Sequence, residues 1–147
     1  MKALVIYDST YGNTEKVAQA IGQAIAAEVR RVGQVSPSDL KAFDLVIIGS
    51  PTMGGRPTEA IQGLLKTAGS ALQGVSAAAF DTRLTAKWVR IFNYAAPRIA
   101  GSLKEMGAAL LGSPEGFFVQ GKEGPLKEGE LERAAEWAKE IVKSKTR

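Results

Sequence analysis

The sequence contains no cysteine and no histidine. Their absence excludes disulfide bonds, thiolate nucleophiles, zinc clusters of the usual type and imidazole general bases. Any redox chemistry performed by this chain must therefore be carried by a bound cofactor.

Long apolar runs are also missing, since no stretch approaches the ~20 residues that a membrane-spanning helix requires. The N-terminus has one lysine before a short apolar run and no small-residue cleavage site. We therefore expect neither a signal peptide nor a transit peptide, no stable membrane insertion, and a cytoplasmic location. The length of 147 residues predicts one domain over residues 1–147.

Acidic residues are absent from one segment. The net charge is only +4, but residues 82–104 contain no aspartate or glutamate. The basic residues of this segment are Arg83, Lys87, Arg90, Arg98 and Lys104. No recognition-helix or RNA-binding motif accompanies them, so we do not expect nucleic acid as a partner.

Apolar runs alternate with helical patterns along the whole chain. Strands are predicted at 3–7, 28–35, 44–48, 76–80 and 116–120, with 108–111 as a possible start of the last one. The runs lack period-two alternation, as expected for strands that helices cover on both faces. This pattern predicts an α/β fold, in which a doubly wound parallel sheet has helices on both faces.

The loop after the first predicted strand is rich in hydroxyl groups. It consists of Ser9, Thr10, Tyr11, Gly12, Asn13 and Thr14. A helical pattern follows, and the free N–H groups and dipole of a helix N-terminus favour an anion. No lysine or arginine lies between Lys2 and Lys16, which favours a single phosphate held by neutral donors.

This loop has two other interpretations. It has one glycine and matches neither the P-loop nor the dinucleotide-binding pattern, which disfavours ATP and NAD as primary ligands. The simplest structural explanation is an ordinary helix N-cap cluster, because serine, threonine and asparagine are the usual capping residues.

Two further loops follow predicted strands. Residues 49–57 contain three glycines and two prolines, a composition that stiffens a loop and lets its backbone approach a ligand. Residues 81–84 follow the fourth strand. In doubly wound sheets, ligands bind at the carboxyl ends of the strands beside the point where strand order reverses. The three loops are therefore expected to converge on one site.

The run from Val5 to Thr14, followed by Ala18 and Ile21, resembles the flavodoxin signature. The resemblance covers essentially the whole chain and implies a short-chain, flavodoxin-like five-stranded sheet of order 2-1-3-4-5 with FMN at the switch point between the first and third strands, for which flavodoxin is itself a known example. It implies that the first loop holds the FMN phosphate through Ser9, Thr10, Tyr11, Gly12, Asn13 and Thr14. Pro51, Thr52, Met53, Gly54 and Gly55 would line the flavin, and Asp81, Thr82 and Arg83 would reach its pyrimidine side.

Two features depart from the family pattern. Many flavodoxins stack a tryptophan and a tyrosine on the flavin, whereas the second loop offers Met53 and the third has no aromatic residue before Trp88. Typical flavodoxins are acidic, whereas this chain is basic. We hypothesise that Arg83 stabilises a negatively charged reduced flavin and raises its reduction potential, with a solvated surface charge as the alternative.

The segment after Arg83 combines apolar and basic residues. Trp88, Ile91 and Phe92 suit core packing best, but with Lys87 and Arg90 they would also form an apolar patch with a basic rim. Such a patch would dock a redox partner with an acidic docking face or admit a quinone.

The favoured function is an FMN-binding flavoprotein in electron transport, which carries electrons between redox partner proteins and needs no catalytic side chain. The alternative is an FMN-dependent oxidoreductase acting on a small substrate, similar to flavodoxin-like quinone reductases or protoporphyrinogen oxidases. A receiver-type signalling domain is disfavoured, because its phosphoacceptor site needs several carboxylates and Asp8 stands nearly alone.

Overall fold

The computed structural model describes residues 1–84 and 94–146, and its centre is a parallel sheet. Strand β1 (Ala3–Tyr7) lies between β2 (Glu28–Arg31) and β3 (Leu45–Pro51). Strand β4 (Ser76–Leu84) follows β3, and the fifth position is shared by β5 (Ala109–Leu110) and β6 (Glu115–Val119), which both pair with β4. The order β2-β1-β3-β4-β5 confirms the predicted fold and strand order.

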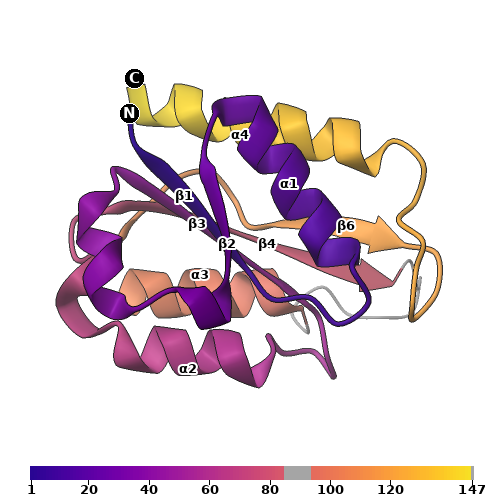
Figure 1. Ribbon diagram of the computed structural model, residues 1–147, viewed down its shortest axis with the longest axis horizontal. Helices are drawn as coiled ribbons and strands as arrows, with labels where there is room; N and C mark the ends of the chain where they lie inside the picture. The colour runs from indigo at the N-terminus through magenta and orange to yellow at the C-terminus, as the bar shows by residue number, and fades with distance from the viewer. Residues whose placement is uncertain (85–93, 147) are drawn as a thin grey trace.

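Helices cover both faces of this sheet (Figure 1). Helices α1 (Asn13–Ile25) and α4 (Glu130–Thr146) pack together on one face, and α2 (Glu59–Thr67) and α3 (Ala95–Glu105) cover the other. Alternate residues of β1 enter the two resulting cores: Leu4 and Ile6 face α2 and α3, whereas Val5 faces α1 and α4. Burial on both sides explains why the strand sequence does not alternate between polar and apolar residues.

Several element boundaries differ from the sequence prediction. The strand predicted over 28–35 ends at Arg31, where the short helix η1 (Val32–Gln34) begins, and η2 (Pro37–Ala42) follows. The fourth strand continues to Leu84 because β6 pairs with its last five residues. Pro97 is the third residue of α3 rather than the first. The N-cap predicted at Thr58 is confirmed, since its hydroxyl accepts a hydrogen bond from the Ile61 N–H.

A buried carboxylate attaches the start of α4 to β6. Glu130 accepts hydrogen bonds from the Phe118 N–H at 2.7 Å and from two nitrogens of Arg133. Burial alone would raise the pKa of Glu130, but the Arg133 guanidinium and the Phe118 N–H outweigh it and hold the pKa below its ordinary value. The network fixes both ends of the loop that connects β6 to α4.

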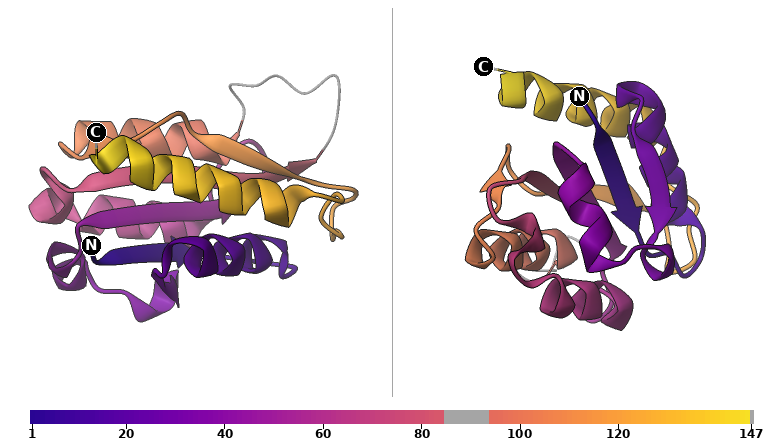
Figure 2. Two further views of the ribbon diagram at one scale, coloured as in Figure 1. Left: turned by 90° about the horizontal axis from the view of Figure 1, so that it is seen from above. Right: turned by 60° about the vertical axis from the view of Figure 1, so that its left-hand side comes forward.

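The carboxyl ends of the strands and the chain termini lie at opposite ends of the sheet. Figure 2 shows the N-terminus and the end of α4 at one end of the molecule, away from the loops that follow β1 and β3 and from the end of β4. Within residues 1–84 and 94–146, no helix has the length and apolar character needed to cross a membrane. The predictions made for Lys87, Trp88, Arg90, Ile91 and Phe92 lie outside the described residues.

Candidate functional site

The loops after β1 and β3 and the end of β4 surround one cavity of about 270 Å³ at the carboxyl edge of the sheet. Its lining consists of Ser9, Thr10, Tyr11, Asn13, Thr14, Pro51, Thr52, Met53, Gly54, Thr82, Arg83, Leu84, Val119 and Lys122. The three predicted segments therefore meet at one cavity, but residues 81–84 belong to strand β4 and not to a loop. Gly12, Gly55 and Asp81, which were also predicted for the site, do not line the cavity.

The first loop presents a row of free backbone donors. Gly12 is the N-cap of α1, with a φ of 92° that favours glycine. Its N–H donates to the Ser9 hydroxyl at 3.0 Å, which closes the turn. The N–H groups of Thr10, Tyr11, Asn13 and Thr14 donate to no residue in the described part of the chain. Because these groups lie at the positive end of a 13-residue helix, the loop suits an anion.

Two threonines join the first loop to the end of β4. The hydroxyls of Thr14 and Thr82 lie 2.8 Å apart and are buried. Their residues are 68 positions apart in the chain, so this bond fixes the first loop relative to the end of β4. The Thr82 carbonyl also accepts from the Thr52 N–H at 2.9 Å, which attaches the second loop to the same strand end.

The second loop contains a tight turn from Met53 to Arg56. The N–H of each of these two residues donates to the carbonyl of the other, at 2.8 and 3.1 Å. Gly54 and Gly55 at the centre have φ values of 59° and 79°, as in a type I′ turn. The turn holds Met53 half exposed at the cavity wall, where a flat apolar ligand would contact it.

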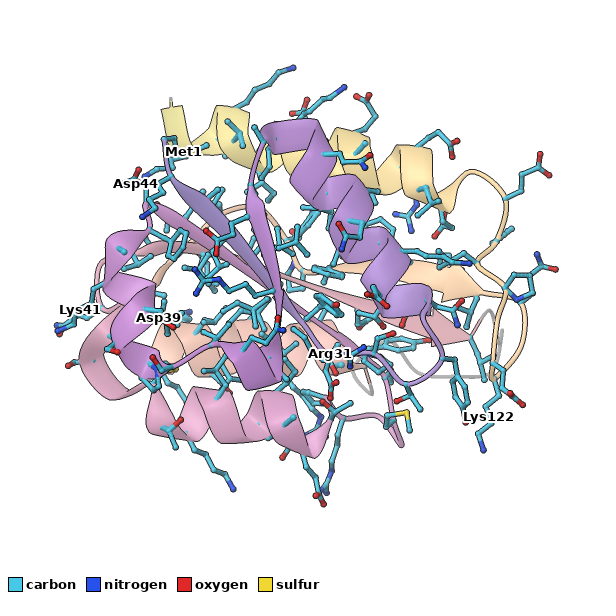
Figure 3. The ribbon with its side chains drawn as sticks, in the orientation of Figure 1. Met1, Arg31, Asp39, Lys41, Asp44 and Lys122 are labelled. Atoms are coloured by element: carbon cyan, nitrogen blue, oxygen red, sulfur yellow. The ribbon has the colours of Figure 1, made fainter. Side chains whose placement is uncertain are left out.

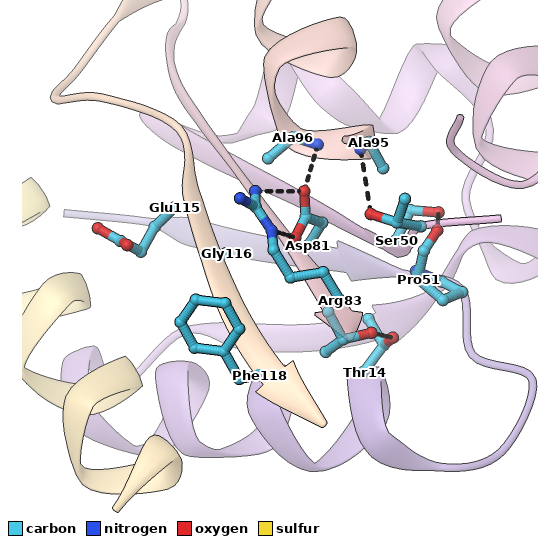
Figure 4. A network of polar contacts seen from close by, with 12 residues as sticks. Thr14, Ser50, Pro51, Asp81, Arg83, Ala95, Ala96, Glu115, Gly116 and Phe118 are labelled. Carbon is cyan, nitrogen blue, oxygen red and sulfur yellow. Dashed lines mark hydrogen bonds and ion pairs between the residues drawn. The ribbon is translucent and has the colours of Figure 1, made fainter. Parts of the chain in front are cut away.

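Asp81 and Arg83 form an ion pair at the cavity wall rather than two free charges, and only Arg83 lines the cavity (Figure 4). The Nε and Nη2 atoms of Arg83 each donate to one carboxylate oxygen of Asp81 at 2.8 Å. The guanidinium lies 3.6 Å from the centroid of the Tyr94 ring. It also packs against Gly116, where a Cβ atom would meet Arg83 Nε at 2.1 Å.

The same carboxylate caps helix α3. Asp81 has no exposed surface and accepts the Ala96 N–H at 2.8 Å, while the Ala95 N–H donates to the Thr52 hydroxyl at 3.1 Å. Burial raises the pKa of Asp81, against the opposing effect of Arg83, the Ala96 N–H and Thr52. Arg83 is thus neither a solvated surface charge nor an unpaired cation. Its effect on the flavin potential would be reduced by the paired carboxylate.

Three residues of the cavity lining were missed by the sequence analysis: Leu84, Val119 and Lys122. Lys122 belongs to the loop after β6, for which the sequence analysis predicted no role in the site. This loop contacts the start of α1, because the Asn13 side-chain amide donates to the Glu123 carbonyl at 3.2 Å. Figure 3 places Lys122 at the end of the molecule opposite Lys41. The first loop contains no lysine or arginine, and Lys122 supplies a positive charge to the same cavity.

The cavity has the composition expected for a phosphorylated aromatic ligand. Hydroxyls and free N–H groups gather at the start of α1, and Pro51, Met53, Leu84 and Val119 supply apolar surface. In the described residues, the lining includes no carboxylate, and no cluster of side chains suited to a metal ion is found. Fold and cavity together define a doubly wound α/β domain that holds a mononucleotide at its strand order reversal.

A family model described as flavodoxin matches residues 5–137, so the chain belongs to the flavodoxin family. A flavodoxin from the domain Archaea superposes with a TM-score of 0.81 at 25% identity, and the alignment covers 99% of both chains. A protein of Methylocella silvestris described as NAD(P)H dehydrogenase (quinone) is 27% identical over 82% of this chain and 75% of its own length. The flavodoxin of Maridesulfovibrio salexigens is 38% identical over 40% of this chain and 44% of its own length.

Membership of this family identifies the cofactor as FMN. The residues of the cavity fit it: the first loop offers neutral donors for a phosphate, and the second loop offers an apolar wall for a ring. We propose that the 14 residues predicted from the sequence form this site, with Gly12, Gly55 and Asp81 shaping the loops rather than contacting FMN. The three missed residues complete the lining.

We expect Lys122→Met to weaken FMN binding about 5-fold, because one partly solvated charge pair contributes ~1 kcal/mol. Riboflavin, which lacks the phosphate, should bind the variant as it binds the natural protein. Fluorescence titration of the apoprotein with both ligands measures the two dissociation constants. The control is Lys127→Met, which removes an exposed lysine of the same loop that does not line the cavity. Equal weakening of both ligands would show that Lys122 does not act on the phosphate.

Proposed function

We propose that this protein is an electron carrier that uses bound FMN to transfer electrons between redox partner proteins. The observation that carries this proposal is the composition of the cavity, whose described lining joins neutral phosphate donors to an apolar wall and contains no carboxylate. Its ionisable side chains are Tyr11, Lys122 and Arg83; Arg83 is paired with Asp81, and we assign Lys122 to the phosphate. An enzyme acting on a small substrate commonly needs a general acid or base beside the reacting atoms, whereas an electron carrier does not.

The flavin supplies the redox chemistry when bound, by accepting and donating electrons. The protein positions the flavin: the first loop holds the phosphate, and the Met53–Arg56 turn holds the apolar wall. The Asp81–Arg83 pair fixes the end of β4 relative to the start of α3. Because Thr82 bonds to both Thr14 and Thr52, the phosphate end and the ring end of the site are held together.

The partner proposed from the sequence has an acidic docking face. The basic charge of the chain supports this proposal, since complementary charges accelerate association and orient the encounter. A cytoplasmic location remains a prediction from the sequence.

The second candidate is an FMN-dependent oxidoreductase that acts on a quinone or on a porphyrinogen. The similarity to relatives described as NAD(P)H dehydrogenase (quinone) favours the quinone. Flavin chemistry does not require a protein acid or base in every case, so a substrate seated directly on the ring is compatible with this cavity.

Steady-state and single-turnover assays separate the two candidates. As a carrier, the FMN-loaded protein should reduce quinones with NAD(P)H no faster than free FMN does. After photoreduction, it should transfer electrons to an acidic acceptor protein of higher reduction potential, with a rate that falls as salt is added. Saturable NAD(P)H-dependent quinone turnover well above that of free FMN would reject the carrier function and support the oxidoreductase.

A further inference from the structure

A second depression of about 360 Å³ lies between helices α2 and α3, outside the FMN cavity. It is lined by Arg56, Pro57, Gln62, Leu65, Lys66, Arg98, Ser102, Glu105 and Met106. Both helices lie side by side on the same face of the sheet in Figure 1. We call this depression the α2/α3 groove.

The α2/α3 groove is rich in uncompensated positive charge. Arg56, Lys66 and Arg98 are exposed, and none of them forms an ion pair with another described residue. Glu105 is the one carboxylate in the described lining. Cations left without partners on a surface favour an anionic ligand, because such a ligand regains the Coulomb energy that no protein group supplies.

The positive charges are spread along the groove rather than gathered at one point. Arg56 precedes α2 and Arg98 lies in the first turns of α3, so both are at the end nearest the FMN cavity. Lys66 lies in the last turn of α2, and nine helical residues span about 14 Å. Leu65, Pro57 and Met106 provide apolar surface between the two ends. This layout suits an extended chain with several negative charges and an apolar side chain.

One tight turn connects the groove to the FMN cavity. Met53 lines the cavity and Arg56 lines the groove, and their two mutual backbone hydrogen bonds hold them at opposite ends of the same turn. A protein surface that covers the groove would therefore also lie beside the flavin. Such proximity is what electron transfer between two proteins requires.

We propose that the α2/α3 groove docks an acidic segment of the redox partner protein and so places that partner beside the flavin. The inference rests on the proposed carrier function and identifies the surface and the partner chemistry for it. A protein segment is favoured over a nucleotide because the cations stand apart at the two ends. The glycine-rich dinucleotide fingerprint, Gly-x-Gly-x-x-Gly, precedes neither α2 nor α3, which also disfavours a dinucleotide.

The test compares two double variants of the FMN-loaded protein. Lys66→Glu/Arg98→Glu reverses two charges of the groove and leaves the FMN cavity untouched. Lys41→Glu/Lys139→Glu makes the same change of net charge at exposed sites in η2 and on α4, away from the groove. The probe is a fluorescein-labelled peptide of six acidic residues around a leucine, with its amide counterpart as the neutral control. Binding is followed by fluorescence anisotropy at low and high salt, and NADP⁺ is tested as a competitor.

The natural protein and the control variant should bind the acidic peptide with similar affinity, and the groove variant about 10-fold more weakly or not at all. High salt should remove the difference, and the amide peptide should not bind. Equal binding of the peptide by the two variants would overturn the proposal. Displacement of the peptide by low concentrations of NADP⁺ would also overturn it and would assign the groove to a nucleotide. FMN affinity is measured for both variants, and unchanged affinity would show that a loss of peptide binding does not come from damage to the cofactor site. The quinone assay tests the carrier function independently.

Discussion

Asp81→Ala is expected to lower the free energy of unfolding by about 3–5 kcal/mol, because it leaves a largely buried guanidinium without its partner. Arg83 is only 13% exposed in its side chain and lies against Tyr94 and Gly116, so it cannot simply move into water. The Ala96 N–H would lose its acceptor at the same time. Urea unfolding of the apoprotein, followed by circular dichroism, measures the change.

Two further variants show whether the ion pair is the cause. Asp44→Ala removes an exposed carboxylate that accepts one backbone N–H, and should cost less than about 1 kcal/mol. Asp81→Leu combined with Arg83→Met removes both charges and should recover much of the loss, since burial of the pair carries its own desolvation cost. A double variant as unstable as Asp81→Ala would show that the carboxylate acts through the α3 cap and not through Arg83.

Ser9→Ala combined with Thr10→Val is expected to weaken FMN binding by about 150-fold or more, because each of the two hydrogen bonds to a charged group contributes at least ~1.5 kcal/mol. Both residues line the cavity, and the Ser9 hydroxyl also accepts the Gly12 N–H that closes the turn. Riboflavin should lose far less affinity than FMN, since it carries no phosphate. Fluorescence titration of the apoprotein with the two ligands provides the comparison.

A matched control is Thr67→Val combined with Ser70→Ala, which removes two exposed hydroxyls at the end of α2. This variant should bind both ligands normally. If the first-loop variant bound FMN and riboflavin with equally reduced affinity, the phosphate would have to lie elsewhere in the cavity.

The first loop and the fold were accessible from the sequence because their signals are local. A buried apolar run, a hydroxyl-rich turn and a helical repeat follow one another within residues 3–25. Parallel strands then require that the loops after β1, β3 and β4 share one edge of the sheet. The loops after β1 and β3 do meet at one cavity, together with the end of β4.

Lys122 was not predicted for the site because its position depends on a contact between distant parts of the chain. The loop after β6 meets α1 through Asn13 and Glu123, which are 110 positions apart. No local pattern marks that pairing. Gly124 fits this pairing, since a Cβ atom there would meet the Asn13 side chain at 2.6 Å, but the glycine alone does not predict it.

The pairing of Arg83 with Asp81, by contrast, could have been predicted from the sequence. Residues two apart in a strand lie on the same face. Once β4 is extended to Leu84, Asp81 and Arg83 become neighbours of opposite charge on that face. The strand was predicted to end at Phe80, so the two residues were treated as loop positions with independent roles.

Both chain ends lie away from the FMN cavity, at the far end of the sheet (Figure 2). A flexible linker on either end would thus leave the cofactor edge facing outward. Attachment of the protein to an electrode or a resin through such a linker would leave the cofactor edge accessible to an incoming redox protein. The same arrangement would let this domain be joined to another enzyme without obstructing electron exchange.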